Sequence, residues 1–97
     1  MSDIDIVYVP EKSRYEIHVD GKVAGITRAK EGDDGVLLFS HTEVDDAYEG
    51  QGLASKLVAG ALGDVRARGR RIEVTCEYVE GFLEKHPEYQ DLLAETE

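Results

Sequence analysis

The segment from Val44 to Ala54 combines residue types whose spacing suits the binding of an anion. A short acidic turn is followed by three small residues at alternate positions, Gly50, Gly52 and Ala54, which lead into an amphipathic run. Small residues let the backbone approach a ligand closely, and the start of a helix leaves free N–H groups and a partial positive charge. The segment therefore predicts an anion site, and phosphate is the usual occupant of such a site.

The place of this glycine loop in the chain argues against two common phosphate sites. Dinucleotide-binding folds carry their glycine loop after the first strand, whereas this loop follows the fourth predicted strand. A mononucleotide loop ends in Gly-Lys-Ser/Thr, and the run 50–55 has no lysine at that point. A pyrophosphate that faces three or four backbone amides remains a good fit, and Lys56 in the first helical turn is the cation placed to reach it.

Hydrophobic periodicity predicts the elements that position the loop. Alternating apolar residues predict four strands joined by short turns, over residues 4–9, 15–19, 23–29 and 36–44. Later spacings predict a helix over 53–68, a fifth strand over 72–74, a helix over 77–85 with Tyr78 and Phe82 facing inward, and a last short helix over 87–93. A helix between the fourth and fifth strands requires a parallel crossover. We therefore expect one domain over 1–97 of α/β class, a mixed α+β sheet with four largely antiparallel N-terminal strands, a helix, a parallel fifth strand and C-terminal helices.

Charge and composition exclude several classes of partner. The net charge of −10 disfavours nucleic acid, because such binding depends on Lys and Arg neutralising phosphates. It would favour a cationic partner such as an amine or a Lys-rich peptide, although solubility or adaptation to a salty cytoplasm is the simpler explanation of the charge. No apolar run approaches the roughly 18 residues that span a membrane, and the acidic N-terminus lacks an apolar signal segment. The sole cysteine, Cys76, cannot form an internal disulfide, so we expect a cytoplasmic protein with no membrane partner and leave its oligomeric state open.

The strand, turn and loop resemble the acetyl-CoA-binding motif of the GCN5-related N-acetyltransferases (GNATs). That motif is an apolar strand end, a turn, an aromatic residue and then Arg/Gln-x-x-Gly-x-Gly/Ala opening a helix. Val44, Tyr48, Gly52 and Ala54 fall on it, while Glu49 stands where Arg or Gln is usual. Over nearly its whole length the chain is similar to the small GNAT-like domain of the YjdJ type, through the stretches 40–44, 48–54 and 86–89 and the single cysteine after the fifth strand.

The resemblance implies a minimal GNAT-like fold with acetyl-CoA as its cofactor and assigns residues to it. The fourth and fifth strands would splay apart to admit the pantetheine arm, whose amides would bond to backbone groups near Glu43 and Val44. The acetyl carbonyl would lie between the strand ends, near His41 and Cys76. The residues implied at the pyrophosphate are Gln51, Gly52, Leu53, Ala54, Ser55 and Lys56.

The resemblance also raises the question of which group handles protons. The stretch 82–85, Phe-Leu-Glu-Lys, resembles a Phe-Tyr-Glu-Lys stretch in larger family members, in which the tyrosine often protonates the departing CoA thiolate. Leu83 occupies that position here and cannot donate a proton. Cys76 is the candidate to replace it, as general acid or as a nucleophile that carries the acetyl group, and a buried inert cysteine is the alternative. His41 is the candidate base, placed where a contact with Cys76 can form, and a solvated histidine at a strand end is the alternative.

These observations favour an acetyl-CoA-dependent N-acetyltransferase that acts on an unidentified amine, either a small molecule or a Lys-containing peptide. His86 would end the second helix or contact the adenosine of the cofactor, and no His, Cys or Asp cluster has the spacing of metal ligands. Two alternatives stay open. One is a module that binds acyl-CoA or CoA without transfer, and the other is a small acidic domain that binds a basic protein.

Overall fold

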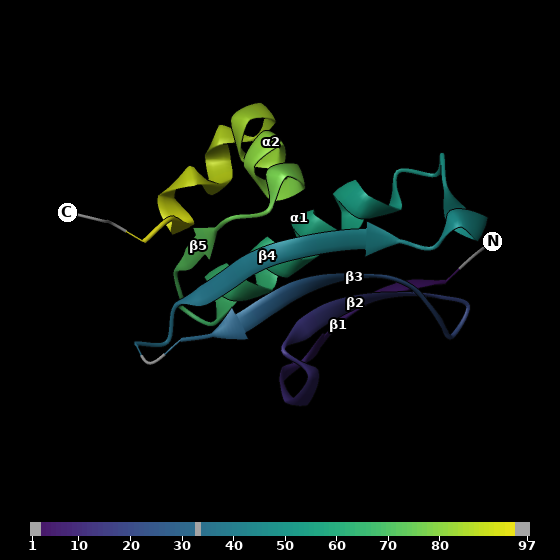
Figure 1. Cartoon of the computed structure of the whole chain (residues 1–97), viewed down its shortest axis with the longest axis horizontal. Coiled ribbons are helices and arrows are strands. Elements are labelled where there is room, and N and C mark those ends of the chain that lie inside the picture. The colour runs from purple at the N-terminus through teal and green to yellow at the C-terminus, as the bar shows by residue number, and fades with distance from the viewer. Residues whose placement is uncertain (1–2, 33, 95–97) are drawn as a thin grey trace.

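The computed structural model describes residues 3–32 and 34–94, and the other residues of the predicted domain lie outside this range. Its centre is a five-stranded sheet in the order β1-β2-β3-β4-β5 (Figure 1). The strands are β1 Ile4–Val9, β2 Arg14–Val19, β3 Lys22–Glu31, β4 Leu37–Val44 and β5 Ile72–Val74. The first four pair antiparallel and β5 pairs parallel to β4, which confirms the predicted mixed sheet.

Two α-helices follow the antiparallel strands. They are α1 Leu53–Ala67 and α2 Glu77–Lys85, and the 3₁₀ segments are η1 Pro10–Lys12, η2 Asp46–Tyr48 and η3 Pro87–Leu92. The predicted last helix is thus of the tighter 3₁₀ type, because the amides of Tyr89 and Leu93 bond to carbonyls three residues earlier. No helix among residues 3–32 and 34–94 is both long and apolar enough to cross a membrane.

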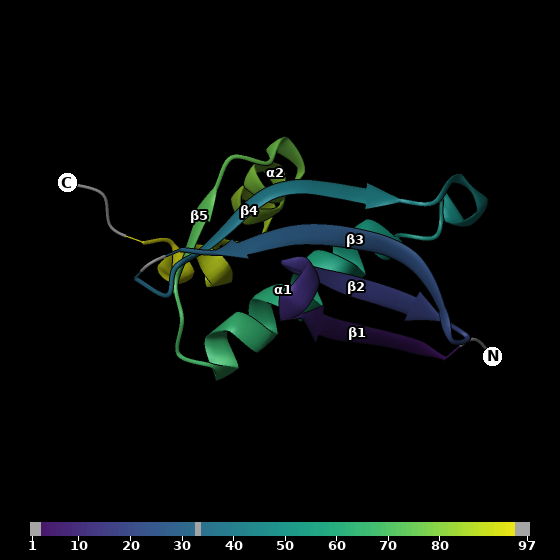
Figure 2. The same cartoon turned by 60° about the horizontal axis from the view of Figure 1, so that its bottom comes forward.

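One face of α1 packs against β1 to β4 (Figure 2). Its buried residues recur at spacings of three and four, as the periodicity predicts: Leu53, Leu57, Val58, Ala61, Leu62 and Val65. They share one core with side chains of the sheet that are fully buried, including Tyr15, Ile17, Leu37 and Phe39. Burying one such leucine side chain contributes about 1.5–3 kcal/mol. This face therefore holds α1, and with it the glycine loop, at the end of β4.

β5 accompanies β4 over only three residues, Leu37–Phe39 opposite Ile72–Val74. The Phe39 carbonyl then accepts the amides of both Thr75 and Cys76, at 3.0 and 3.2 Å. Beyond that point the chain turns into α2, while β4 continues to Val44 without β5 beside it (Figure 1). The fourth and fifth strands therefore diverge.

β4 carries a bulge where this divergence begins. The register places His41 opposite Arg28 but Phe39 opposite Ala29. One step along β3 therefore spans two steps along β4, and Ser40 is the extra residue. A bulge reverses which side of the strand each later backbone group faces, so it decides what β4 presents beyond this point.

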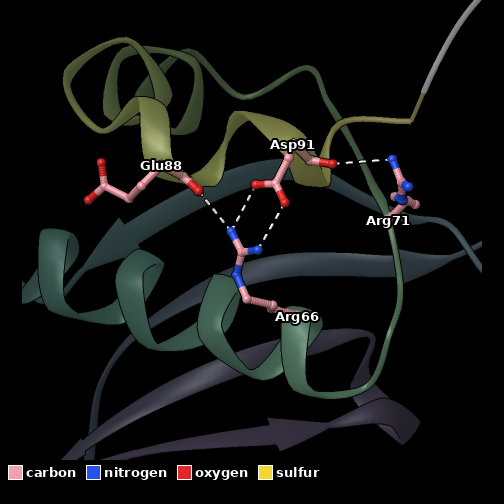
Figure 3. A network of polar contacts seen from close by, with 4 residues as sticks. All are labelled: Arg66, Arg71, Glu88 and Asp91. Carbon is pink, nitrogen blue, oxygen red and sulfur yellow. Dashed lines mark hydrogen bonds and ion pairs between the residues drawn. The ribbon is translucent and has the colours of Figure 1, made fainter.

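The C-terminal segment is anchored to the far end of α1 by arginines (Figure 3). Arg66 donates two hydrogen bonds to the Asp91 carboxylate, both at 2.9 Å, and one to the Glu88 carbonyl at 2.8 Å. Arg71 donates to the Asp91 carbonyl at 3.2 Å. The bonds from Arg66 hold the pKa of Asp91 below its ordinary value. The arginines at this helix end thus fix η3 in place, far from the glycine loop.

Candidate functional site

The start of α1 presents unpaired backbone amides. Gly50 and Gly52 have φ angles of 81° and 71°, a region that L side chains rarely adopt. A Cβ added to either would meet no atom within 4 Å, so the backbone conformation and not crowding requires glycine. The first intrahelical bond runs from the Lys56 amide to the Gly52 carbonyl, at 3.2 Å, and the amides that precede it have no helical acceptor: those of Leu53, Ala54 and Ser55. The first turn holds no acidic residue, so the positive end of the helix dipole is uncompensated there.

Two hollows meet at this helix start. The first has a volume of about 200 Å³ and is lined by Val44, Tyr48, Glu49, Gly50, Gly52, Leu53, Ala54, Ser55 and Tyr78. The second, of about 400 Å³, shares Ser55 and Tyr78 with the first and extends along α2 to Lys85 and His86. The two hollows are therefore adjacent, and their lining residues extend from the end of β4 to the end of α2. The side chains of Gln51 and Lys56 are exposed and line neither hollow.

The backbone of β4 beyond the bulge has a free side. Asp45 donates its amide to the Ala24 carbonyl of β3 at 2.8 Å, and backbone groups alternate between the two sides along a strand. The amides and carbonyls of Thr42 and Val44 therefore face away from β3, toward the side that β5 has left. The backbone groups of Glu43 face β3 instead, so of these two residues only Val44 presents its backbone to the open side. The bulge at Ser40 sets the phase of this alternation, because without the extra residue the backbone groups of Glu43 would face the open side instead.

Cys76 immediately precedes α2 and contacts a threonine of β4. Its side chain is 7% exposed, and its thiol donates a hydrogen bond to Thr42 Oγ1 over 3.5 Å. Thr42 Oγ1 lies 2.8 Å from Oγ1 of Thr27, which is fully buried. The sequence pattern assigns no role to either threonine, because their pairing depends on the register of β3 against β4, which the pattern does not show.

His41 lies on the opposite face of the sheet from this cluster. Successive side chains of a strand point to opposite faces, and Thr42 points toward the face that carries Cys76. The His41 side chain is 56% exposed, and its Nε2 lies 3.5 Å from Glu43 Oε2. Among the described residues no hydrogen bond joins His41 to Cys76, so the contact considered for this pair is not made.

The buried face of α2 consists of Val79, Phe82 and Leu83. Leu83 is therefore a core residue, and its carbonyl accepts a hydrogen bond from the Gln90 side chain at 2.9 Å. The prediction that Tyr78 faces inward is wrong, because it lies one position off this face. It is 42% exposed and lines both hollows. An aromatic ring therefore stands beside the loop.

His86 follows the last residue of α2, as expected for a residue that ends the helix. Its amide donates to the Phe82 carbonyl at 2.9 Å, and its ring stacks on Phe82 with the centroids 4.3 Å apart. In the part of the chain that the structure describes, no group of three or more His, Cys, Asp or Glu side chains is placed to hold a metal ion.

The sequence of this chain is similar to those of known proteins. The model of one protein family, described as GCN5-related N-acetyl-transferase, matches residues 14–92. Protein NATD1 of Bos taurus is 45% identical over 52 residues, which are 54% of this chain and 46% of NATD1, and that of Homo sapiens is 38% identical over the same length. The chain thus spans about half the length of these curated relatives.

Solved structures share the fold. A GCN5-like protein from Staphylococcus aureus superposes with a TM-score of 0.70 at 24% identity, covering 100% of this chain and 94% of the other. The ribosomal-protein-alanine N-acetyltransferase of Brucella melitensis gives a TM-score of 0.53 at 17% identity, covering 87% of this chain and 62% of the other. With the family match over most of its length, the chain belongs to the GCN5-related N-acetyltransferase family.

Proposed function

We propose that this protein binds acetyl-CoA and transfers its acetyl group to an amine. The observation that carries the proposal is the start of α1, where the backbone amides have no helical acceptor and Gly50 and Gly52 have positive φ angles. This helix start lies beside the part of β4 that is no longer paired with β5. Backbone amides at a helix start suit a pyrophosphate. The free side of β4 suits the amides of a pantetheine arm, because an extended chain can bond to a strand edge.

The residues present fit such a cofactor. The amides of Leu53, Ala54 and Ser55 would hold the pyrophosphate, and the backbone of Val44 would hold pantetheine. Tyr78 offers an aromatic surface to the adenine, and Lys85 a positive charge to the phosphate on the ribose. The hollow of about 200 Å³ is smaller than a usual ligand site, but taken together with the adjacent hollow of about 400 Å³ it reaches the size of one. The Glu49 carboxylate would repel the pyrophosphate, so the backbone amides must supply most of the attraction for it.

The cofactor supplies an acetyl group held as a thioester, and this chain must move two protons. The amine must lose one as it attacks, and the sulfur that leaves the acetyl carbon must gain one. Cys76 holds a proton on one face of β4, and His41 can accept one on the other face. Separate faces suit a reaction in which cofactor and amine approach β4 from opposite sides.

The amine would approach on the face that carries His41. Glu43, which points to the same face as His41, helps to line a hollow of about 450 Å³ together with Val23, Ala24, Gly25, Ile26, Val44, Asp45 and Asp46. Three carboxylates line it and no cation does, which favours a positively charged acceptor. We therefore propose a small amine or a Lys-containing peptide as substrate.

The test combines binding and turnover. Calorimetry with acetyl-CoA measures its affinity, and release of free CoA thiol in the presence of amines, polyamines and Lys peptides measures transfer. We expect Cys76→Ala to bind acetyl-CoA as tightly as the wild type but to lose turnover by about a hundredfold or more, the usual contribution of a general acid. Unchanged turnover would remove Cys76 from the chemistry. Binding without transfer to any acceptor would indicate a binding module, and no binding at millimolar acetyl-CoA would refute the proposal.

A further inference from the structure

We propose that Thr42 is a positioning residue for Cys76, and that Thr42 and Thr27 form a hydroxyl pair that can reverse its direction. This inference rests on the proposed function, in which Cys76 gives up and regains a proton. The three groups form one chain, from Cys76 Sγ to Thr42 Oγ1 over 3.5 Å and on to Thr27 Oγ1 over 2.8 Å.

The burial of Thr27 supports a role beyond packing. A buried hydroxyl costs about 1–3 kcal/mol unless it is hydrogen-bonded. Thr27 is completely buried, so its hydroxyl would carry this full cost without a partner. The hydrogen bond that the hydroxyl makes is the one to Thr42. Valine has nearly the same shape, so close packing at this position does not require a hydroxyl.

The pair can serve both protonation states of Cys76. A hydroxyl has one proton and two acceptor lone pairs, and its proton rotates to suit its surroundings. While the thiol donates to Thr42, the single proton of Thr42 can go to Thr27. Once the sulfur is a thiolate, Thr42 can donate to the sulfur and Thr27 can donate to Thr42. Neither state requires a heavy atom to move.

This reversal matches the proton balance of the proposed reaction. As the amine nitrogen bonds to the acetyl carbon, the bond from that carbon to sulfur breaks and its electron pair stays on the departing sulfur. Cys76 gives its proton to that sulfur, and Thr42 turns to donate to the Cys76 thiolate. The proton lost by the amine passes to His41 or to water, and water returns a proton to Cys76 before the next turnover.

The test uses the fact that Cys76 is the sole cysteine. Its alkylation by iodoacetamide requires the thiolate and does not depend on acetyl transfer, so failure of this inference is distinguishable from failure of the proposed function. Thr42→Val removes the hydroxyl and Thr42→Ser keeps it. Thr75→Val is the matched control, because Thr75 is exposed and adjoins Cys76 in the chain.

We expect T42V to slow alkylation about tenfold, the effect of one hydrogen bond to a charged group. T42S should restore the rate to within about twofold, and T75V should match the wild type. T27V should give a smaller loss, because Thr42 keeps its own proton. Thermal melts identify any variant that has failed to fold. If T42V fails to fold, the alkylation rate of T42S compared with that of the wild type still tests the role of the hydroxyl. A wild-type rate in T42V, or a rate in T42S as low as in folded T42V, would overturn the proposal.

Discussion

Replacing Gly52 by alanine separates the cost of a strained backbone from the cost to ligand binding. Gly52 has a φ of 71° and Gly69, just beyond the far end of α1, has a φ of 70°. A Cβ would meet no atom within 4 Å at either position. Both substitutions should therefore lower the free energy of unfolding by about 1–2 kcal/mol, the cost of a left-handed backbone for a residue with a Cβ. For a domain of this size each 1 kcal/mol lowers Tm by about 4–8 °C.

Only Gly52→Ala should also weaken acetyl-CoA binding. Its Cβ would enter open space beside the amides of Leu53 and Ala54, where the pyrophosphate is proposed to lie. Losing one hydrogen bond to a charged oxygen costs about 1.5–3 kcal/mol, so Kd should rise by about tenfold to a hundredfold.

Gly69→Ala is the matched control for this experiment, and its Kd should equal that of the wild type. Calorimetric titration of both variants, at a temperature where each is folded, makes the comparison. If the two variants lose stability equally and bind acetyl-CoA equally well, the glycine loop is not the pyrophosphate site.

Two further predictions concern stability. Gly63→Ala should raise the free energy of unfolding by about 1 kcal/mol through helix propensity, since its Cβ meets no atom within 4 Å. Gly60→Ala should not give this gain, because its Cβ would lie 3.0–3.2 Å from three atoms of Ile6. Urea melts that give the two variants equal stability would contradict this. The hydrogen bond with His18 holds the pKa of Glu16 below its ordinary value of 4.5, so the ionised carboxylate stabilises the fold above that value and the contribution is lost as pH falls below it. Between about pH 5 and about pH 3 the wild type should therefore lose more stability than Glu16→Gln, and equal losses in thermal melts would be evidence against it.

The order of the elements and the glycine loop before α1 could be predicted because each depends on local pattern. The periodicity of α1 shows which side chains are buried, and glycines before a helix start favour an anion site wherever they occur. The bulge at Ser40 depends instead on how two strands pair. The extra residue shifts the alternation of the strand by one, so Thr42 and not His41 shares the face of Phe39 and Cys76. Without knowledge of the bulge, the alternation would put His41 on the face of Phe39 and Cys76.

The orientation of α2 was a second limit of the sequence pattern. The helix has nine residues, and its buried face rests on three of them. One residue turns a helix by about 100°, so a one-position error moves a side chain from the core to the surface. Tyr78 is such a case, and its exposed ring belongs to the proposed cofactor surface.

The most direct test of the central claim is an NMR titration of the ¹⁵N-labelled protein with acetyl-CoA. Saturable shifts are expected in the amide signals of residues 51–55 at the start of α1 and of Val44 on the free side of β4. Signals from the far end of α1, around Gly69, should stay in place. No shift at millimolar acetyl-CoA, or shifts confined to other parts of the chain, would contradict the claim that this helix start holds the cofactor.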